Sequence, residues 1–149
     1  MITATASDHT LEQIHHEHER LEVLTTEIRW MLLEPSEAHL ALIKGLMSEL
    51  ATLLEIHFAH EEEGGYFTEL VEMAPELSAR VEQLRQEHRE MSATIRAMNS
   101  RLRHASSTPL WFEAICRDFS HFLNRCEAHQ HEENLLAQEG YLRDMGEGD

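Results

Sequence analysis

The spacing of apolar residues is the feature that most constrains the fold of this chain. Apolar side chains recur every three or four positions, and no run alternates apolar and polar residues as a strand would. Pro35, the pair Gly64-Gly65 and a turn at 105–109 divide this pattern into four segments of similar length. Because short connections force neighbouring helices to run antiparallel, the sequence predicts an all-α fold, an up-down-up-down four-helix bundle with a single domain over residues 1–149.

Capping residues and glycines predict where these helices begin and end. We expect the first helix to begin near Ser7, Asp8 or Thr10, and Ser36 to cap the second. Gly140 is expected to end the fourth helix.

The connection between the second and third segments is expected to contain further helical structure. Residues 66–74 are predicted to form one or two turns, and Pro75 suits the first position of the third helix. The stripes predicted to be buried are Leu11, Ile14, Leu21, Leu24 and Ile28; Leu40, Ile43, Leu46, Leu50, Leu53 and Leu54; Leu77, Val81, Leu84, Met91, Ile95 and Met98; and Trp111, Ile115, Phe119, Phe122, Leu135 and Leu136.

The charge balance excludes two classes of partner. The chain has 28 acidic and 12 basic residues, a formal net charge of −16, and Lys44 is its one lysine. This excess repels phosphate backbones and anionic lipids, so we expect no nucleic acid and no membrane as partner. Cys116 and Cys126 lie ten positions apart on one predicted helix, too far to pair. Since residues 1–10 also lack the parts of a secretion signal, we expect a cytoplasmic protein.

The abundance of histidine beside carboxylates indicates a metal site. The chain has 12 His, and imidazole and carboxylate bind iron, zinc or manganese without thiolates. His57/Glu61 and His129/Glu133 share the spacing His-x-x-x-Glu, which places both side chains on one helix face. The same spacing occurs at His15/Glu19 and His18/Glu22, so the position of each pair relative to the apolar stripes decides which matters.

Four histidines are predicted to point inward at a similar depth. His57, His88 and His129 lie on apolar stripes, and His18 does so in the first helix, with His15 as the next candidate there. In an antiparallel bundle, the starts of the first and third helices share one pole with the ends of the second and fourth. Four imidazoles and two carboxylates at one level predict a dinuclear metal site, because buried carboxylates need a positive partner.

The neighbouring polar residues are not expected to be metal ligands in the first instance. His60 and His131 are expected to support the ligands or to be exposed, and Glu62 and Glu63 to form a solvated face. Tyr66 is expected to pack, with contact to an exogenous ligand as the alternative.

These motifs together resemble the hemerythrin-like family, also called HHE cation-binding proteins. The resemblance covers nearly the whole chain and is carried by His18-x-x-Leu21, His57-Phe-Ala-His-Glu61-Glu62, Glu87-His88 and His129-x-x-x-Glu133. It implies two non-haem irons in an Fe–O–Fe centre, with zinc or manganese as possible substitutes. The implied bridges are Glu61 and Glu133, and the implied terminal ligands are His18, His57, His88 and His129, with His15 and then His60 as candidates for a fifth histidine.

Two departures place the chain closer to bacterial HHE proteins. Oxygen-carrying hemerythrins have a second histidine where this chain has Ser92 and an aspartate where it has Asn134. The bacterial proteins are linked to oxygen, nitric oxide or peroxide responses, to iron handling and to repair of iron-sulfur clusters. Fewer protein ligands leave open metal positions, which favours binding or redox chemistry over a closed structural site.

Three functions follow as hypotheses. The first is a non-haem diiron protein that binds a small diatomic or peroxide ligand for sensing, storage or stress protection. The second is a diiron enzyme or iron donor, such as a peroxidase or a protein for iron-sulfur cluster repair. The third is a zinc-bound or metal-free helical interaction protein.

Overall fold

A computed structural model describes residues 2–105 and 108–147, with the backbone alone for residues 2–9, 141 and 143–147. The long helices are α1 (Ile2–Leu32), α2 (Glu37–Glu63), α4 (Ser78–Arg103) and α5 (Pro109–Glu147). Between α2 and α4 lie the short helix α3 (Tyr66–Met73) and a 3-10 turn, Pro75–Leu77.

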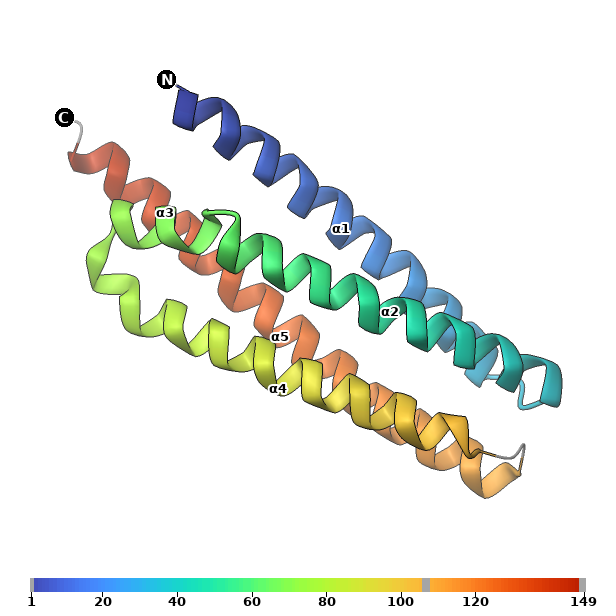
Figure 1. Ribbon diagram of the computed structural model, residues 1–149. Helices are drawn as coiled ribbons and strands as arrows, with labels where there is room; N and C mark the ends of the chain where they lie inside the picture. Colours follow the sequence, from blue (N-terminus) through green and yellow to red (C-terminus); the bar gives the residue numbers. More distant parts are fainter. Residues whose placement is uncertain (1, 106–107, 148–149) are drawn as a thin grey trace.

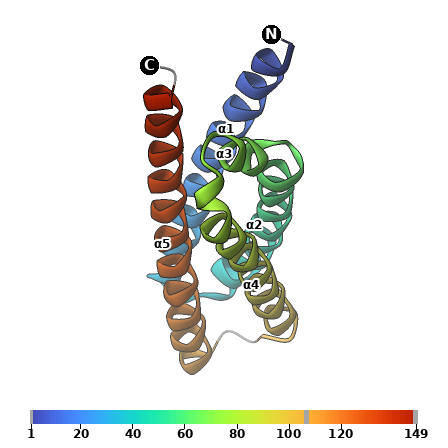
Figure 2. The same cartoon turned by 90° about the vertical axis from the view of Figure 1, so that its left-hand side faces the viewer.

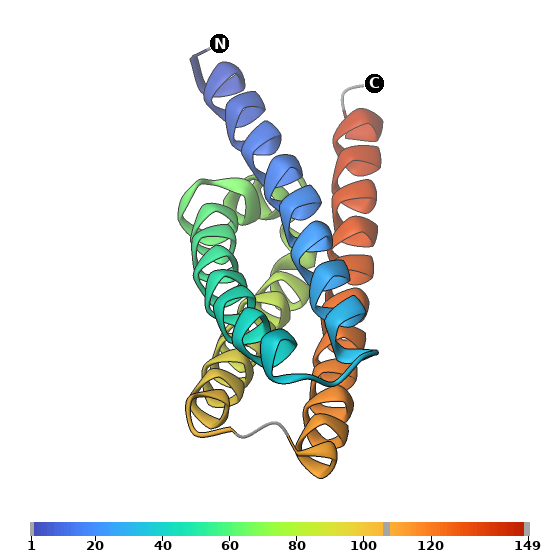
Figure 3. The ribbon, with the colours of Figure 1, turned by 90° about the vertical axis from the view of Figure 1, so that its right-hand side faces the viewer.

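The long helices form the bundle that the sequence predicts. Each runs antiparallel to the long helix before it, so α1 and α5 have their free ends at the same pole, where α3 also lies (Figure 1). Viewed from two further directions, α1 and α5 diverge toward their free ends (Figures 2 and 3). α1 packs mainly against α2 and touches α5 only sparsely. The seam between the first and last long helices is therefore the loosest in the bundle.

Two helix ends lie beyond their predicted positions. α1 begins at Ile2, before Ser7, because residues 2–9 contain neither glycine nor proline to stop it. α5 continues past Gly140 to Glu147. A Cβ on Gly140 would lie 3.3 Å from Leu70 Cδ2, so this glycine serves the close approach of α3 and does not end the helix.

The connections confirm Ser36 as a cap and the pair Gly64-Gly65 as a break, whereas Pro75 lies before α4, and the turn predicted at 105–109 falls partly outside the described residues. The Ser36 side chain accepts a hydrogen bond of 3.0 Å from the backbone N–H of His39, which caps α2. Gly65 has φ of 97°, a left-handed conformation that glycine adopts without strain, and it ends the turn between α2 and α3. Pro75 opens the 3-10 turn, so α4 begins three residues later than predicted, at Ser78.

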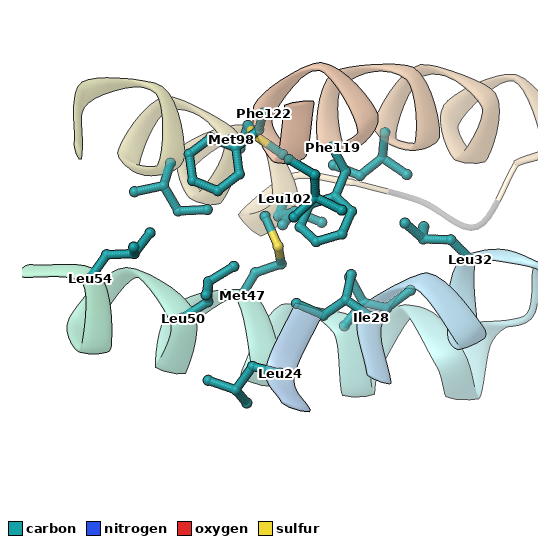
Figure 4. Packing of buried hydrophobic residues seen from close by; sticks show 14 of the residues in the cluster. Leu24, Ile28, Leu32, Met47, Leu50, Leu54, Met98, Leu102, Phe119 and Phe122 are labelled. Carbon is teal, nitrogen blue, oxygen red and sulfur yellow. The ribbon is translucent and has the colours of Figure 1, made fainter. Parts of the chain in front are cut away.

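The buried apolar residues form two separate clusters. The large apolar cluster contains Leu24, Ile28, Leu32, Leu40, Ile43, Met47, Leu50, Leu54, Phe58, Met91, Ile95, Met98, Leu102, Phe112, Ile115, Phe119, Phe122 and Leu123. The small apolar cluster contains Phe67, Leu70, Ala74, Leu77, Val81, Leu84 and Leu136. Figure 4 shows Met47 in the large cluster, surrounded by side chains from other helices.

Two residues predicted to be buried are exposed. Leu11 is 44% exposed, because α1 extends past the end of α2 at this level, where Thr10 already lies opposite Gly64. Leu135 is 37% exposed, whereas its neighbour Leu136, which points about 100° away around the helix, is fully buried in the small apolar cluster. Among the described residues, no helix combines the length and apolar character that a membrane span requires.

The facing of α2 can be tested with two adjacent aliphatic residues. Ile43 is fully buried in the large apolar cluster and Leu42 is 53% exposed. Ile43→Ala should lower the free energy of unfolding of the metal-free protein by about 2–5 kcal/mol, and Leu42→Ala by less than about 1 kcal/mol. Urea unfolding followed by circular dichroism measures both losses. Equal losses would show that α2 is rotated from the orientation described.

Candidate metal centre

The structure brings together the six residues that the sequence predicts as metal ligands. They come from four helices: His18 from α1, His57 and Glu61 from α2, His88 from α4, and His129 and Glu133 from α5. His18 is half-buried, and the other five are buried.

The centre lies between the two apolar clusters. Along α4, His88 stands between Leu84 of the small cluster and Met91 of the large one. The His88 ring is stacked between two phenylalanines, with centroid distances of 3.9 Å to Phe58 and 5.4 Å to Phe67. Apolar packing on both sides thus shields the polar side chains from water.

The six side chains form two donor groups that share one carboxylate. Glu61, His88, His129 and Glu133 form one group, and His18, His57 and Glu61 form the other, with the donor atoms of each within 4.8 Å of one another. Glu61 Oε1 lies 3.4 Å from His57 Nε2 and 3.1 Å from His88 Nε2. A carboxylate shared in this way is placed to bridge two cations.

The centre contains buried acceptors that the protein does not satisfy. Both carboxylate oxygens of Glu61 and Glu133, and Nε2 of His18, lack a hydrogen-bond partner among the described residues. Glu61 is 0% and Glu133 1% exposed. Leaving buried polar groups unpaired is costly, and burying an uncompensated charge costs several kcal/mol. The chemistry of these donors therefore fits bound cations.

Three carboxylates orient three of the imidazoles. His57 Nδ1 donates to Glu17 at 2.9 Å, His88 Nδ1 to Glu62 at 2.8 Å and His129 Nδ1 to Glu87 at 2.8 Å. Each bond crosses from one helix to the next: α1 to α2, α2 to α4, and α4 to α5. A carboxylate behind a histidine fixes the ring and raises its basicity as a ligand.

This orientation leaves two nitrogen lone pairs facing each other. With both Nδ1 atoms donating, Nε2 of His88 and Nε2 of His129 carry no proton, yet they lie 3.1 Å apart. Two lone pairs at this distance repel, and a cation between them turns the repulsion into attraction.

Burial also sets the protonation states that a metal requires. Removal from water lowers the pKa of His88 to about 2 and that of His18 to about 4, and it lowers the pKa of His57 and His129 as well. These imidazoles are neutral at pH 7, which is the metal-binding form. Burial raises the pKa of Glu133 to about 8, so its ionised form needs a positive neighbour.

The orienting carboxylates are not among the ligands predicted from the sequence, and the expectation that Glu62 forms a solvated face is wrong. Glu62 is half-buried on His88, whereas Glu63 is exposed as expected. A signal was present, because Glu17, Glu62 and Glu87 each adjoin a candidate ligand in the sequence. Adjacent residues of a helix point about 100° apart, so a residue beside an inward ligand can face the neighbouring helix.

The other polar candidates lie outside the donor groups. His15 is exposed and pairs with Glu19 at 3.1 Å, so the structure does not bring this fifth candidate to the centre. His60 is half-buried and donates to Glu17, and His131 is exposed. Tyr66 packs beside Phe67 with ring centroids 5.8 Å apart.

Comparison with known proteins identifies the family. The model of the hemerythrin HHE cation binding domain matches residues 9–139. No match was found among curated proteins or among solved structures. Since the family model covers most of the chain, the all-α bundle and its inward His and Glu residues are those of a metal-binding helical protein, and the chain belongs to the hemerythrin HHE cation-binding family.

Proposed function

We propose that this protein holds two neighbouring non-haem iron ions and binds O2, NO or peroxide at them. The observation that carries the proposal is Glu61, which belongs to both donor groups and whose two oxygens have no hydrogen-bond partner among the described residues. Sensing, storage or protection against oxidative or nitrosative stress are the roles that such binding serves.

Each proposed iron has its own set of ligands. His88, His129 and Glu133 would hold one ion, His18 and His57 would hold the other, and Glu61, which belongs to both donor groups, would contribute to both. The family resemblance also implies Glu133 as a bridge, but the structure brings this carboxylate only into the group with His88 and His129. Nitrogen and oxygen donors without thiolate suit iron, and they also accept manganese or zinc. When bound, the iron pair supplies a redox-active centre for the small ligand.

The protein's contribution is to place donors and exclude water. The ion on the His18 side has three protein donors, which leaves coordination positions for a small ligand. The stacked rings of Phe58 and Phe67 keep bulk solvent from His88. A metal-free interaction protein is disfavoured, because it would bury the carboxylates of Glu61 and Glu133 without compensation.

Metal content is the first test. Protein purified after iron-supplemented growth should contain two irons per chain and show an oxo-to-iron charge-transfer band. Chelation should lower the melting temperature, because ligand at a thousand times its Kd stabilises a fold by about 4 kcal/mol. Less than one bound metal per chain, with a melting temperature that chelation does not change, would contradict the proposal.

Two single substitutions test the ligand assignment. Glu61→Ala should reduce iron from two per chain to less than one, since both ions lose a donor. His129→Ala should also lower the iron content, because it removes a donor from the four-residue group. Elemental analysis of purified protein measures both.

Each variant has a control on the same helix. Glu63 and His131 lie two residues away from Glu61 and His129 and are exposed. Glu63→Ala and His131→Ala should keep two irons per chain. Loss of iron in His131→Ala but not in His129→Ala would mean that α5 is rotated from the orientation described.

The orienting role of Glu87 predicts a graded effect. Glu87→Ala should weaken metal affinity by about 10- to 100-fold, because His129 loses the acceptor for its Nδ1 proton. Glu87→Gln keeps an acceptor oxygen and should fall between Glu87→Ala and the wild type. Competition with a chelator of known affinity measures the order, with exposed Glu90→Gln as the control. An affinity unchanged in Glu87→Ala would contradict the orienting role of Glu87.

A further inference from the structure

A groove between α1 and α5 reaches the candidate metal centre from the surface. Its volume is about 610 Å³, and His18 is among its lining residues. We propose that metal ions enter and leave the centre through this α1/α5 groove, with His15, Glu19, Glu22 and Glu127 as transient cation contacts at its mouth. The inference rests on the proposed function, because it concerns loading of the same centre.

The mouth of the α1/α5 groove carries the residue types that bind cations. Its lining includes His15, Glu19, Glu22 and Glu127, all on exposed positions of α1 and α5. The side chains of His15 and Glu19 are 75% and 63% exposed, with His15 Nε2 3.1 Å from Glu19 Oε1. Arg29, a basic residue of the lining, lies 3.7 Å from Glu127 and offsets part of the negative charge there.

The inner end of the groove leads directly to unpartnered donors. Nε2 of His18 is buried without a hydrogen-bond partner among the described residues. Glu61, which is 0% exposed and whose two oxygens are also unpartnered, belongs to the same donor group. An ion that passes the mouth therefore meets His18 first and the shared carboxylate next.

Two other grooves also reach candidate ligands, but each ends at an imidazole whose Nδ1 is hydrogen-bonded to a glutamate. The groove between α2 and α4, about 520 Å³, reaches His88 at the ring whose Nδ1 donates to Glu62 at 2.8 Å. The groove between α4 and α5, about 180 Å³, reaches His129, whose Nδ1 donates to Glu87 at 2.8 Å. There the imidazole ring stands between an entering ion and the centre. No such carboxylate link to His18 is found in the described part of the chain.

The packing of the bundle supports the same route. α1 and α5 contact each other sparsely and diverge toward their free ends (Figure 3). This seam opens with less loss of packing than the α1–α2 or α2–α4 seams. The formal charge of −16 attracts cations to the whole molecule, and carboxylates at one mouth focus that attraction locally.

Metal uptake kinetics test the route. Apoprotein is mixed with Co²⁺ at low ionic strength, and the visible absorbance of bound Co²⁺ is followed by stopped flow. The groove variant is Glu19→Gln/Glu22→Gln/Glu127→Gln. The matched control is Glu55→Gln/Glu63→Gln/Glu90→Gln, which removes the same charge from exposed residues of the other two grooves.

We expect the groove variant to take up Co²⁺ about five- to tenfold more slowly than wild type. The control variant should be slowed by less than about twofold. Both should reach the wild-type cobalt content. Equal rates in all three proteins, or equal slowing of both variants, would overturn the route while leaving the metal centre intact. A wild-type chain that takes up no cobalt or iron would overturn the proposed function together with the route.

His15→Ala separates a transient contact from a permanent ligand. The transient role predicts slower uptake with an unchanged final cobalt content. A lower final content would make His15 a resident ligand, and an unchanged rate would remove it from the route; either result contradicts the role proposed for it.

Discussion

The burial of two carboxylates between two apolar clusters is the constraint on which the centre depends. Glu61 and Glu133 lie where water does not reach them, and neither accepts a hydrogen bond from the described residues. Nε2 of His88 and of His129 face each other at 3.1 Å without a proton to share. Without cations the unpartnered carboxylates and the two facing nitrogens are unfavourable, whereas with cations the same atoms can act as metal ligands. We therefore expect metal binding to stabilise the fold.

The chain of orienting carboxylates explains how the bundle holds its ligands in place. Glu17, Glu62 and Glu87 each lie next to a candidate ligand on their own helix and bond to a histidine on the following one. Each of these glutamates thus links the ligand beside it on its own helix to a histidine ligand on the next helix. A shift of one helix along its axis would disturb both its own ligand and the ring that it orients, so the ligand set and the helix register stabilise each other.

Much of this arrangement could be predicted from the sequence, because helical periodicity determines which face of each helix is buried. The apolar stripes placed His57, His88 and His129 inward, and Ser36 and Gly65 mark their turns as expected. Contacts between helices follow less directly. Gly140 was expected to end α5, but it allows α3 to approach, and Glu62 was expected to face solvent but orients His88. Both depend on which surface lies opposite, which periodicity along one helix does not specify.

The order of helices in the chain accounts for the asymmetry of the centre. Each of the three carboxylate-to-histidine hydrogen bonds joins two long helices that are consecutive in the chain. The seam between α1 and α5 has no connecting segment and little packing, so neither a turn nor a core fixes the two helices at the distance that such a bond needs. His18 has no orienting carboxylate among the described residues, although its ring packs edge-on against His57 of α2 with centroids 4.5 Å apart, and it is half-buried where the other candidate ligands are buried. If metal loads along this seam as proposed, we expect the His18 side of the centre to exchange its ion more readily than the side held by His88 and His129, because the topology of the bundle leaves His18 without an orienting bond.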